Sequence, residues 1–239
     1  MRKIAFSLLS IALLSAWAAA QDRGAQLDRL DSSRIILNEV MTAPDRGIPD
    51  WIMTSAKCIA IIPSNLKVGF VFGANYGKGV ATCRTEHGWS APAFFRMTGG
   101  SFGFQAGGQA TDLVMVIRTD EGMQRLLTSK FKLGADASAA AGPVGRDAQG
   151  MTDLTLRAQV LTYSRARGLF AGVSINGAVI RQDKNDTRAF YGKMIPFRSI
   201  LNGQTEPPKD SMALLYTVEK YAPTPKPSPV APASTAGGR

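Results

Sequence analysis

The chain has 239 residues, of which 45% are apolar, and it contains one histidine and two cysteines. This composition is typical of a globular protein. It excludes a chain that is disordered throughout, a zinc scaffold built on several cysteines, and any catalytic device that needs two histidines. The formal net charge is +10, which directs attention to anionic ligands.

Residues 1–20 have the pattern of a secretory signal peptide. Arg2 and Lys3 precede an apolar run over residues 4–14, and residues 18–20 are alanines of the kind that a signal peptidase accepts. The apolar run is shorter than the ~20 residues that a transmembrane helix needs. We therefore expect cleavage before Gln21 and export of the folded part; the alternative is a buried N-terminal helix.

Helical periodicity follows directly after this segment. Leucines and other apolar residues recur at spacings of three and four over residues 24–43, and Pro44 ends the pattern. A short second helix is expected over residues 51–57, with Asp50 as its cap. The bases and acids of the first helix are mixed, so we expect it to pack on a sheet rather than lie on an anionic membrane.

Short apolar runs separated by turn residues then predict a sheet. Strands are expected over residues 58–63, 68–84, 93–97, 101–107 and 113–117. The glycines of Asn75–Gly79 predict a tight reversal at that point. Regular short strands favour an antiparallel sheet, and glycines within them indicate bulges or strong coiling.

The second half of the chain continues the same alternation. Helices are expected over residues 119–127, 186–192 and 211–221, and two strands over 154–161 and 169–180 with a turn at Arg165–Gly168. Residues 222–239 hold five prolines among Ala, Ser and Thr, so we expect a disordered tail. The predicted fold is one α+β domain over residues 24–221, with a curved antiparallel sheet (barrel- or sandwich-like) flanked by helices.

The two cysteines, Cys58 and Cys83, allow two interpretations. In an oxidising compartment two cysteines of one domain often form a disulfide. They could equally be two separate buried thiols that act as small apolar residues. Sequence does not decide between these alternatives.

The positive charge is concentrated in two segments. Residues 51–118 hold six bases against two acids, and residues 154–182 hold four bases and no acid. Both segments are predicted to consist largely of strands. A basic surface on the sheet is therefore expected.

Several separated motifs resemble the SYLF family, a lipid-binding family formerly described only as a domain of unknown function. The motifs are Lys67–Phe70 with Tyr76–Gly79, Gly88–Pro92 with Gly99–Ser101, Leu133–Gly145 and Tyr163–Gly177. The resemblance covers about residues 27–201 and identifies the chain as an exported bacterial member. It implies non-catalytic binding of an anionic phospholipid or a similar amphiphile at the bacterial envelope, in the periplasm and peripheral to the membrane.

The residue types suggest which side chains would hold such a lipid. Arginine can bind a phosphate through two parallel hydrogen bonds, and amphipathic aromatic side chains can enter a membrane interface. The bases beside turn glycines in the matching motifs are the candidates for the phosphate: Lys67, Lys78, Arg165 and Arg167. Trp89 and Phe170 are the candidate anchors. Solvated bases and core aromatics are the alternative for each.

Other functional classes have weaker support. Gly99–Gly103 matches a nucleophile-elbow pattern, but it is predicted as strand rather than as a strand-to-helix turn, so we expect no enzyme. His87 has no second ligand at metal-binding spacing, and no cofactor or metal is expected. Export removes nucleic acid as a partner. The second hypothesis is a structural or adhesive envelope protein whose basic patch binds a protein or an acidic polysaccharide; its protein partner is unknown.

Overall fold

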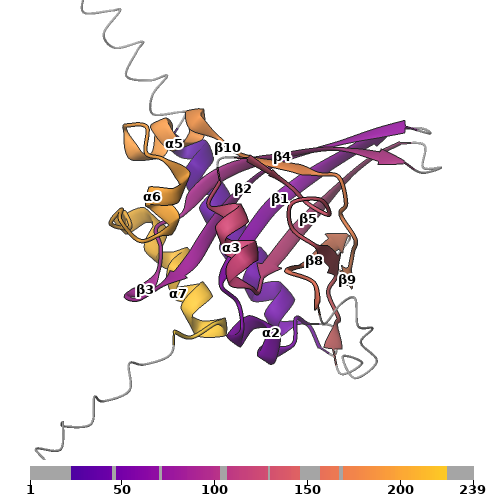
Figure 1. Ribbon diagram of the computed structural model, residues 1–239, viewed down its shortest axis with the longest axis horizontal. Coiled ribbons are helices and arrows are strands. Elements are labelled where there is room, and N and C mark those ends of the chain that lie inside the picture. The colour runs from indigo at the N-terminus through magenta and orange to yellow at the C-terminus, as the bar shows by residue number, and fades with distance from the viewer. Residues whose placement is uncertain are drawn as a thin grey trace, which may run out of the picture.

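The structure is a computed structural model that describes residues 23–44, 47–69, 72–102, 107–128, 130–145, 157–166 and 169–224. Eight strands form a strongly curled half-barrel in the order β6-β10-β4-β2-β1-β5-β8-β7. Two further strands attach to it, β3 to β2 and β9 to β8. Helices flank this sheet (Figure 1), so the predicted fold class is confirmed.

The strands vary widely in length, and the four longest are neighbours in the middle of the sheet. Their bounds are β1 Cys58–Gly69, β2 Phe72–Thr85, β3 Gly88–Trp89, β4 Ala93–Phe102, β5 Gly107–Ile117, β6 Lys130–Lys132, β7 Ala139–Ala141, β8 Val160–Ala166, β9 Leu169–Gly172 and β10 Val179–Gln182. Every named pair is antiparallel except β7 with β8, which is parallel. The ends of β1, β2, β4 and β5 extend past the helices, toward the upper right of Figure 1.

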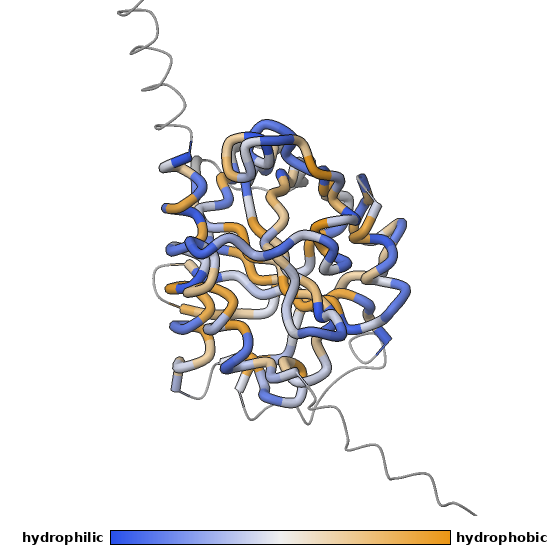
Figure 2. Tube along the Cα trace, turned by 90° about the vertical axis from the view of Figure 1, so that its left-hand side faces the viewer, coloured by the Kyte–Doolittle hydropathy of each residue, from blue (hydrophilic) through white to orange (hydrophobic). Residues whose placement is uncertain are grey.

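Each face of the sheet has its own apolar core. Residues 23–42 form the N-terminal helix, which buries Leu30, Leu37 and Val40 against one face. Helices α2 (Asp50–Thr54) and α7 (Met212–Tyr221) pack into the same core. We call this the helix face. Figure 2 shows apolar segments toward the middle of the molecule and hydrophilic segments around its rim.

The opposite face, which we call the inner face, packs against α3 (Asp120–Leu126) and α6 (Phe197–Leu201). Thr119 caps α3, since its side chain accepts the N–H of Gly122 at 3.0 Å. The remaining helices are α5 (Lys184–Tyr191) and the 3₁₀ turn η2 (Lys209–Ser211). Among the helices that the structure describes, none has the length and apolar character needed to cross a bilayer.

The predicted reversal at Asn75–Gly79 is wrong, because these residues lie inside β2. The glycines have a packing role instead. A Cβ atom added to Gly77 would lie 2.5 Å from Ile62 Cγ2, and one added to Gly79 would lie 2.5 Å from Ile61 O and 2.6 Å from Phe95 Cζ. The curled sheet brings these neighbours so close that only glycine fits.

Replacing Gly79 by Ala should therefore destabilise the protein. The new methyl group would meet backbone as well as a ring, so we expect the free energy of unfolding to fall by about 2 kcal/mol. Chemical denaturation measures this change. Gly24→Ala is the matched control, because a Cβ there meets nothing within 4 Å; it should leave stability equal or slightly higher. Equal stability of Gly79→Ala and wild type would contradict the packing argument.

A bulge bends β1 where its outer half begins. The register shifts between Ile62 and Asn65, where Ser64 has a φ of 54°. The N–H of Ser64 donates to Asp112 Oδ1 on β5 at 2.9 Å. This hydrogen bond holds a left-handed residue in place beside the bend.

Two other expectations need correction. The predicted strand over residues 169–180 is divided into β9 and β10, with non-strand residues 173–178 between them. The reason is that β10 pairs with β4 and β6, whereas β9 pairs with β8 on the other side of the sheet. Helix α6 was not predicted. The predicted signal peptide and nearly all of the predicted tail lie outside the described residues.

Cys58 and Cys83 are joined by a disulfide. The two residues are directly opposite each other at the start of β1 and the end of β2. Both are fully buried on the inner face. The bond therefore fixes the register of the two central strands.

Candidate functional site

Lys78, a predicted lipid ligand, lies in an ion cluster rather than in a turn. Its Nζ is 3.0 Å from Asp186 Oδ1 and 3.3 Å from Asp183 Oδ2. Arg29 Nη1 of the N-terminal helix contacts the other oxygen of Asp186 at 2.5 Å, and Gln26 Nε2 donates to Asp186 Oδ1 at 3.1 Å. We call these five residues the acid cluster.

Electrostatics in the acid cluster are balanced by close contacts. Burial alone would lower the pKa of Lys78, but its hydrogen bond to Asp186 and the two nearby carboxylates raise it. Burial would likewise raise the pKa of Asp186, but the hydrogen bond from Lys78 and the charge of Arg29 lower it. Asp183 also caps α5 by accepting the N–H groups of Asn185 and Asp186, both at 3.1 Å. The cluster therefore holds the N-terminal helix, β2 and α5 together.

The other predicted bases do not join Lys78. Arg165 on β8 pairs with Asp112 on β5 and with Glu39 of the N-terminal helix. Lys67 pairs in register with Asn75 on β2, and since side chains alternate along a strand, it lies on the face opposite to Lys78. Arg167 lies outside the described residues. The lipid-binding role of these bases stays a prediction, but the described ones do not form one patch.

The two predicted aromatic anchors are part of the core. Trp89 and Phe170 are each only 7% exposed. The Nε1 of Trp89 donates to Ala222 O at 3.0 Å, and the guanidinium of Arg84 lies 4.8 Å from the ring centroid. Both rings are buried against protein in this arrangement, and their role as membrane anchors stays a prediction.

A different group of bases lies side by side on the helix face. Lys78 on β2 is directly opposite Arg96 on β4, Arg96 is opposite Arg181 on β10, and Arg181 is opposite Lys130 on β6. We call these four residues the basic row. Neighbouring strands lie ~4.8 Å apart, so the row presents closely spaced cations across one end of the sheet.

Three members of the basic row face solvent and have no ion pair with a described acid. Arg96, Arg181 and Lys130 are exposed. Within the described part of the chain, the ion pairs shorter than 4.0 Å include Lys78 but none of these three. Like charges directly opposite each other destabilise a sheet. The row thus lowers stability unless an anion binds to it.

The basic row borders a cleft of about 470 Å³ beside α5. The basic residues that line the cleft are Arg96, Lys130, Arg181, Lys184 and Arg188. Its one acid is Asp183, which is paired with Lys78. The cleft can bind phosphate or carboxylate groups, since guanidinium groups hold such oxygens in pairs.

Part of this cleft could be recognised from the sequence. Arg96 and Arg181 belong to the two segments with excess charge, but nothing in the order of residues shows that they are cross-strand partners. Lys130, Lys184 and Arg188 lie outside the motifs and were missed. The basic row therefore depends on strand register, which is a property of the folded sheet.

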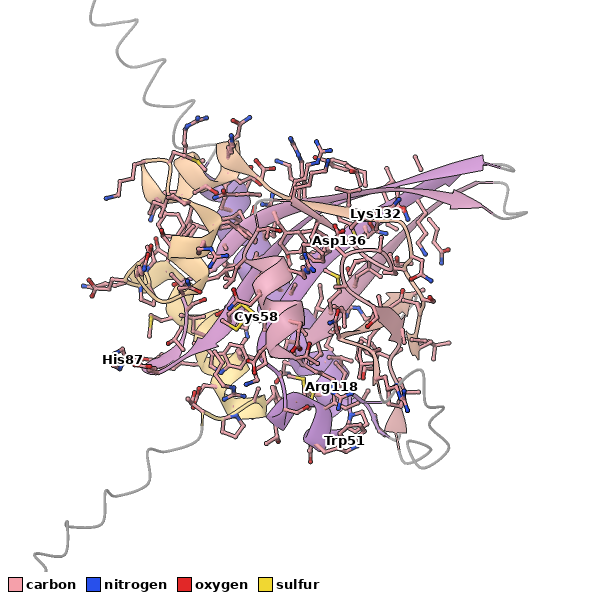
Figure 3. All side chains as sticks on the ribbon, viewed as in Figure 1. Trp51, Cys58, His87, Arg118, Lys132 and Asp136 are labelled. Atoms are coloured by element: carbon pink, nitrogen blue, oxygen red, sulfur yellow. A yellow bond between two sulfur atoms is a disulfide. The ribbon has the colours of Figure 1, made fainter. Side chains whose placement is uncertain are left out.

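Other chemistries find little support in the geometry. Ser101 lies within β4 and not at a strand-to-helix turn. His87 lies on the side of the molecule away from Lys132 (Figure 3). Among the described residues, no group of three His, Cys, Asp or Glu side chains is arranged to hold a metal ion.

Comparison with known proteins relates the chain to one protein family. Residues 98–221 match the Ysc84 family, described as "Las17-binding protein actin regulator". Protein YSC84 of Saccharomyces cerevisiae is 36% identical over 191 residues, which cover 77% of this chain and 40% of the yeast protein. The human SH3 domain-containing YSC84-like protein 1 is 34% identical over 180 residues, covering 74% of this chain and 52% of the relative. The chain thus spans about half the length, or less, of these curated relatives.

Proposed function

Because the chain belongs to the SYLF family, which is the family that Ysc84 represents, we propose that it binds an anionic phospholipid or a similar amphiphile. The binding is non-catalytic. The cleft beside α5 receives the anionic head group, and Arg96, Arg181 and Lys130 of the basic row provide its main contacts. These residues replace the turn-located patch expected from the sequence.

The observation that carries the proposal is the direct opposition of four cations across four strands. Such opposition costs stability, and neutral polar residues in the same places would avoid that cost. A phosphate between the guanidinium groups would remove the repulsion and gain charge-assisted hydrogen bonds. A basic residue near an anionic bilayer contributes about 1 kcal/mol, so several together support reversible attachment.

The proposed location is the bacterial envelope, with the protein exported and peripheral to the membrane. The pattern of residues 1–20 supports export. The disulfide between Cys58 and Cys83 supports it independently, since such bonds persist in oxidising compartments.

A second candidate function is the binding of an acidic protein at the same cleft. The names of the relatives favour it, since one yeast relative, 36% identical over 191 residues, is called LAS seventeen-binding protein 3. A folded acidic partner would meet the same exposed cations. Vesicles made only of lipid separate the two candidates, because they offer no protein.

Neutralising two members of the basic row tests the lipid proposal. Arg96→Gln with Arg181→Gln should weaken binding to vesicles of phosphatidylglycerol and phosphatidylcholine about thirtyfold, since two contributions of about 1 kcal/mol are lost. Vesicle flotation across a range of lipid concentrations measures this change. Binding of wild type should also fall as salt rises, because salt screens exposed charges.

Arg125→Gln with Lys220→Gln is the matched control. It removes the same charge from exposed positions on α3 and α7, outside the cleft. Equal loss in both double variants would mean that only net charge matters. Failure of wild type to float with phosphatidylglycerol vesicles at low salt would refute lipid binding and leave the protein-partner candidate.

A further inference from the structure

The sheet carries a second row of side chains directly beside the basic row. Leu66 on β1 is opposite Tyr76 on β2, Tyr76 is opposite Thr98 on β4, Thr98 is opposite Val179 on β10, and Val179 is opposite Lys132 on β6. We call these residues the outer row: Leu66, Tyr76, Thr98, Val179 and Lys132. Each of the last four is two residues away from a member of the basic row, so both rows lie on the helix face.

The outer row leaves apolar surface exposed. Leu66 is 45% exposed and Tyr76 is 47% exposed. Six large apolar side chains among the described residues are 40% exposed or more, and these two are the cross-strand partners among them. They belong to β1 and β2, two of the strands whose ends extend past the helices (Figure 1).

The alternation of side chains along the strands explains why, at this end of the sheet, the helix face is exposed and the inner face is covered. Met97 and Ile180, which alternate with the row residues, are 0% and 2% exposed because they point into the inner face. On the helix face, the N-terminal helix reaches Lys78 through the acid cluster and Arg165 through Glu39. The outer row lies two residues beyond Lys78 along β2.

We propose that this bare end of the sheet is the surface that lies on the membrane, with Leu66 and Tyr76 entering the bilayer interface and the basic row meeting the phosphates. This inference rests on the proposed function and adds the orientation of the protein. It gives the anchoring role to side chains other than Trp89 and Phe170. Lys132, labelled in Figure 3, ends the outer row.

Charge and shape together favour an anionic bilayer as the occupant. Positions two apart on a strand are separated by about 7 Å. The line of cations, with the apolar Leu66, Tyr76 and Val179 of the outer row at this separation from it, fits a plane of phosphates above a plane of acyl chains. Tyrosine suits the boundary, because its ring is apolar and its hydroxyl is polar. The lysine and arginine stems can also lie along apolar surface while their charges stay with the phosphates.

A site-specific probe tests the orientation directly. The native cysteines are disulfide-bonded and fully buried, so Leu66→Cys provides one accessible thiol for an NBD fluorophore. On phosphatidylglycerol vesicles we expect the emission of this probe to shift to the blue and to be quenched by spin-labelled lipid. The same probe at Tyr216→Cys on α7, where the native side chain is 67% exposed, should show neither change.

Substitution provides the second measurement. Leu66→Ser with Tyr76→Ser should weaken vesicle binding about tenfold, while circular dichroism shows an unchanged fold. If wild type floats but the probe at position 66 behaves as in solution and the Ser variant binds like wild type, the orientation is wrong and the proposed function stands. If wild type does not float with phosphatidylglycerol vesicles at low salt, the proposed function itself fails.

Discussion

Replacing Asp186 by Asn is expected to lower the free energy of unfolding by about 3 kcal/mol, because it leaves two cations in the acid cluster without their main counter-charge. The Asp186 side chain is 4% exposed and the Arg29 side chain 12%. Removing one partner of a buried ion pair costs about 3–5 kcal/mol. The lower end of this energy range applies here, because the Lys78 side chain is 35% exposed and keeps Asp183 as a partner. Urea denaturation monitored by circular dichroism measures the change.

Two controls identify the cause of this loss. Asp31→Asn breaks the exposed pair between Asp31 and Arg34, and it should cost less than about 1 kcal/mol. In a double-mutant cycle, Arg29→Met should cost much less in the Asp186→Asn background than in wild type, since the charge it removes is already unpaired. Additive effects of the two substitutions would show that the cluster does not act as a unit.

We also expect the difference in stability between wild type and Asp186→Asn to depend on pH. The pKa of Asp186 is lower in the folded protein than its ordinary value, mainly because Lys78 and Arg29 outweigh the effect of burial. A lowered folded pKa adds stability that is present above the unfolded pKa and is lost as pH falls through the folded pKa. The difference in the free energy of unfolding between wild type and Asp186→Asn should therefore be largest at neutral pH and become smaller in acid. A gap that stays constant down to acid unfolding would contradict this origin.

The sequence predicted the elements of this fold better than their arrangement. Leu30, Leu37 and Val40 recur at helical spacing, and the helix they predict packs on the sheet as expected. Thr119 is a capping residue that the chemistry of helix ends identifies. The reversal between β1 and β2 was misplaced because Gly77 and Gly79 were interpreted as turn residues. Their real constraint is the neighbouring Ile62, Ile61 and Phe95, which only the folded sheet brings close.

The candidate site was harder to predict for a related reason. Arg96, Arg181 and Lys130 come from three separate segments, and β10 reaches β4 only after the chain has crossed from the other side of the sheet. A shift of one residue in any pairing would turn a member of the basic row to the opposite face. Lys78 was expected beside a turn as a lipid ligand; it lies on β2 instead, and its ionic partners depend on α5. Local patterns do not carry that information.

Removing the disulfide is expected to cause the other large loss of stability. Cys58→Ala with Cys83→Ala should lower the free energy of unfolding by about 3 kcal/mol, since the two residues are 25 apart in the sequence and the bond restricts the unfolded chain. For a protein of this size, that corresponds to a fall in melting temperature of roughly 6–12 °C. Differential scanning calorimetry measures both wild type and variant. A reductant should lower the melting temperature of wild type and leave the variant unchanged.

The position of the bond separates its effect from ligand binding. It joins the first residue of β1 to β2 on the inner face, whereas the basic row and the outer row lie on the helix face, nearer the other end of these strands. We therefore expect the doubly substituted protein, while folded, to bind phosphatidylglycerol vesicles like wild type. Protein isolated from an exported pool should have no reactive thiol before reduction, and two after it under denaturing conditions. Two free thiols in exported, unreduced protein, with a melting temperature insensitive to reductant, would show that Cys58 and Cys83 act only as small apolar residues of the core.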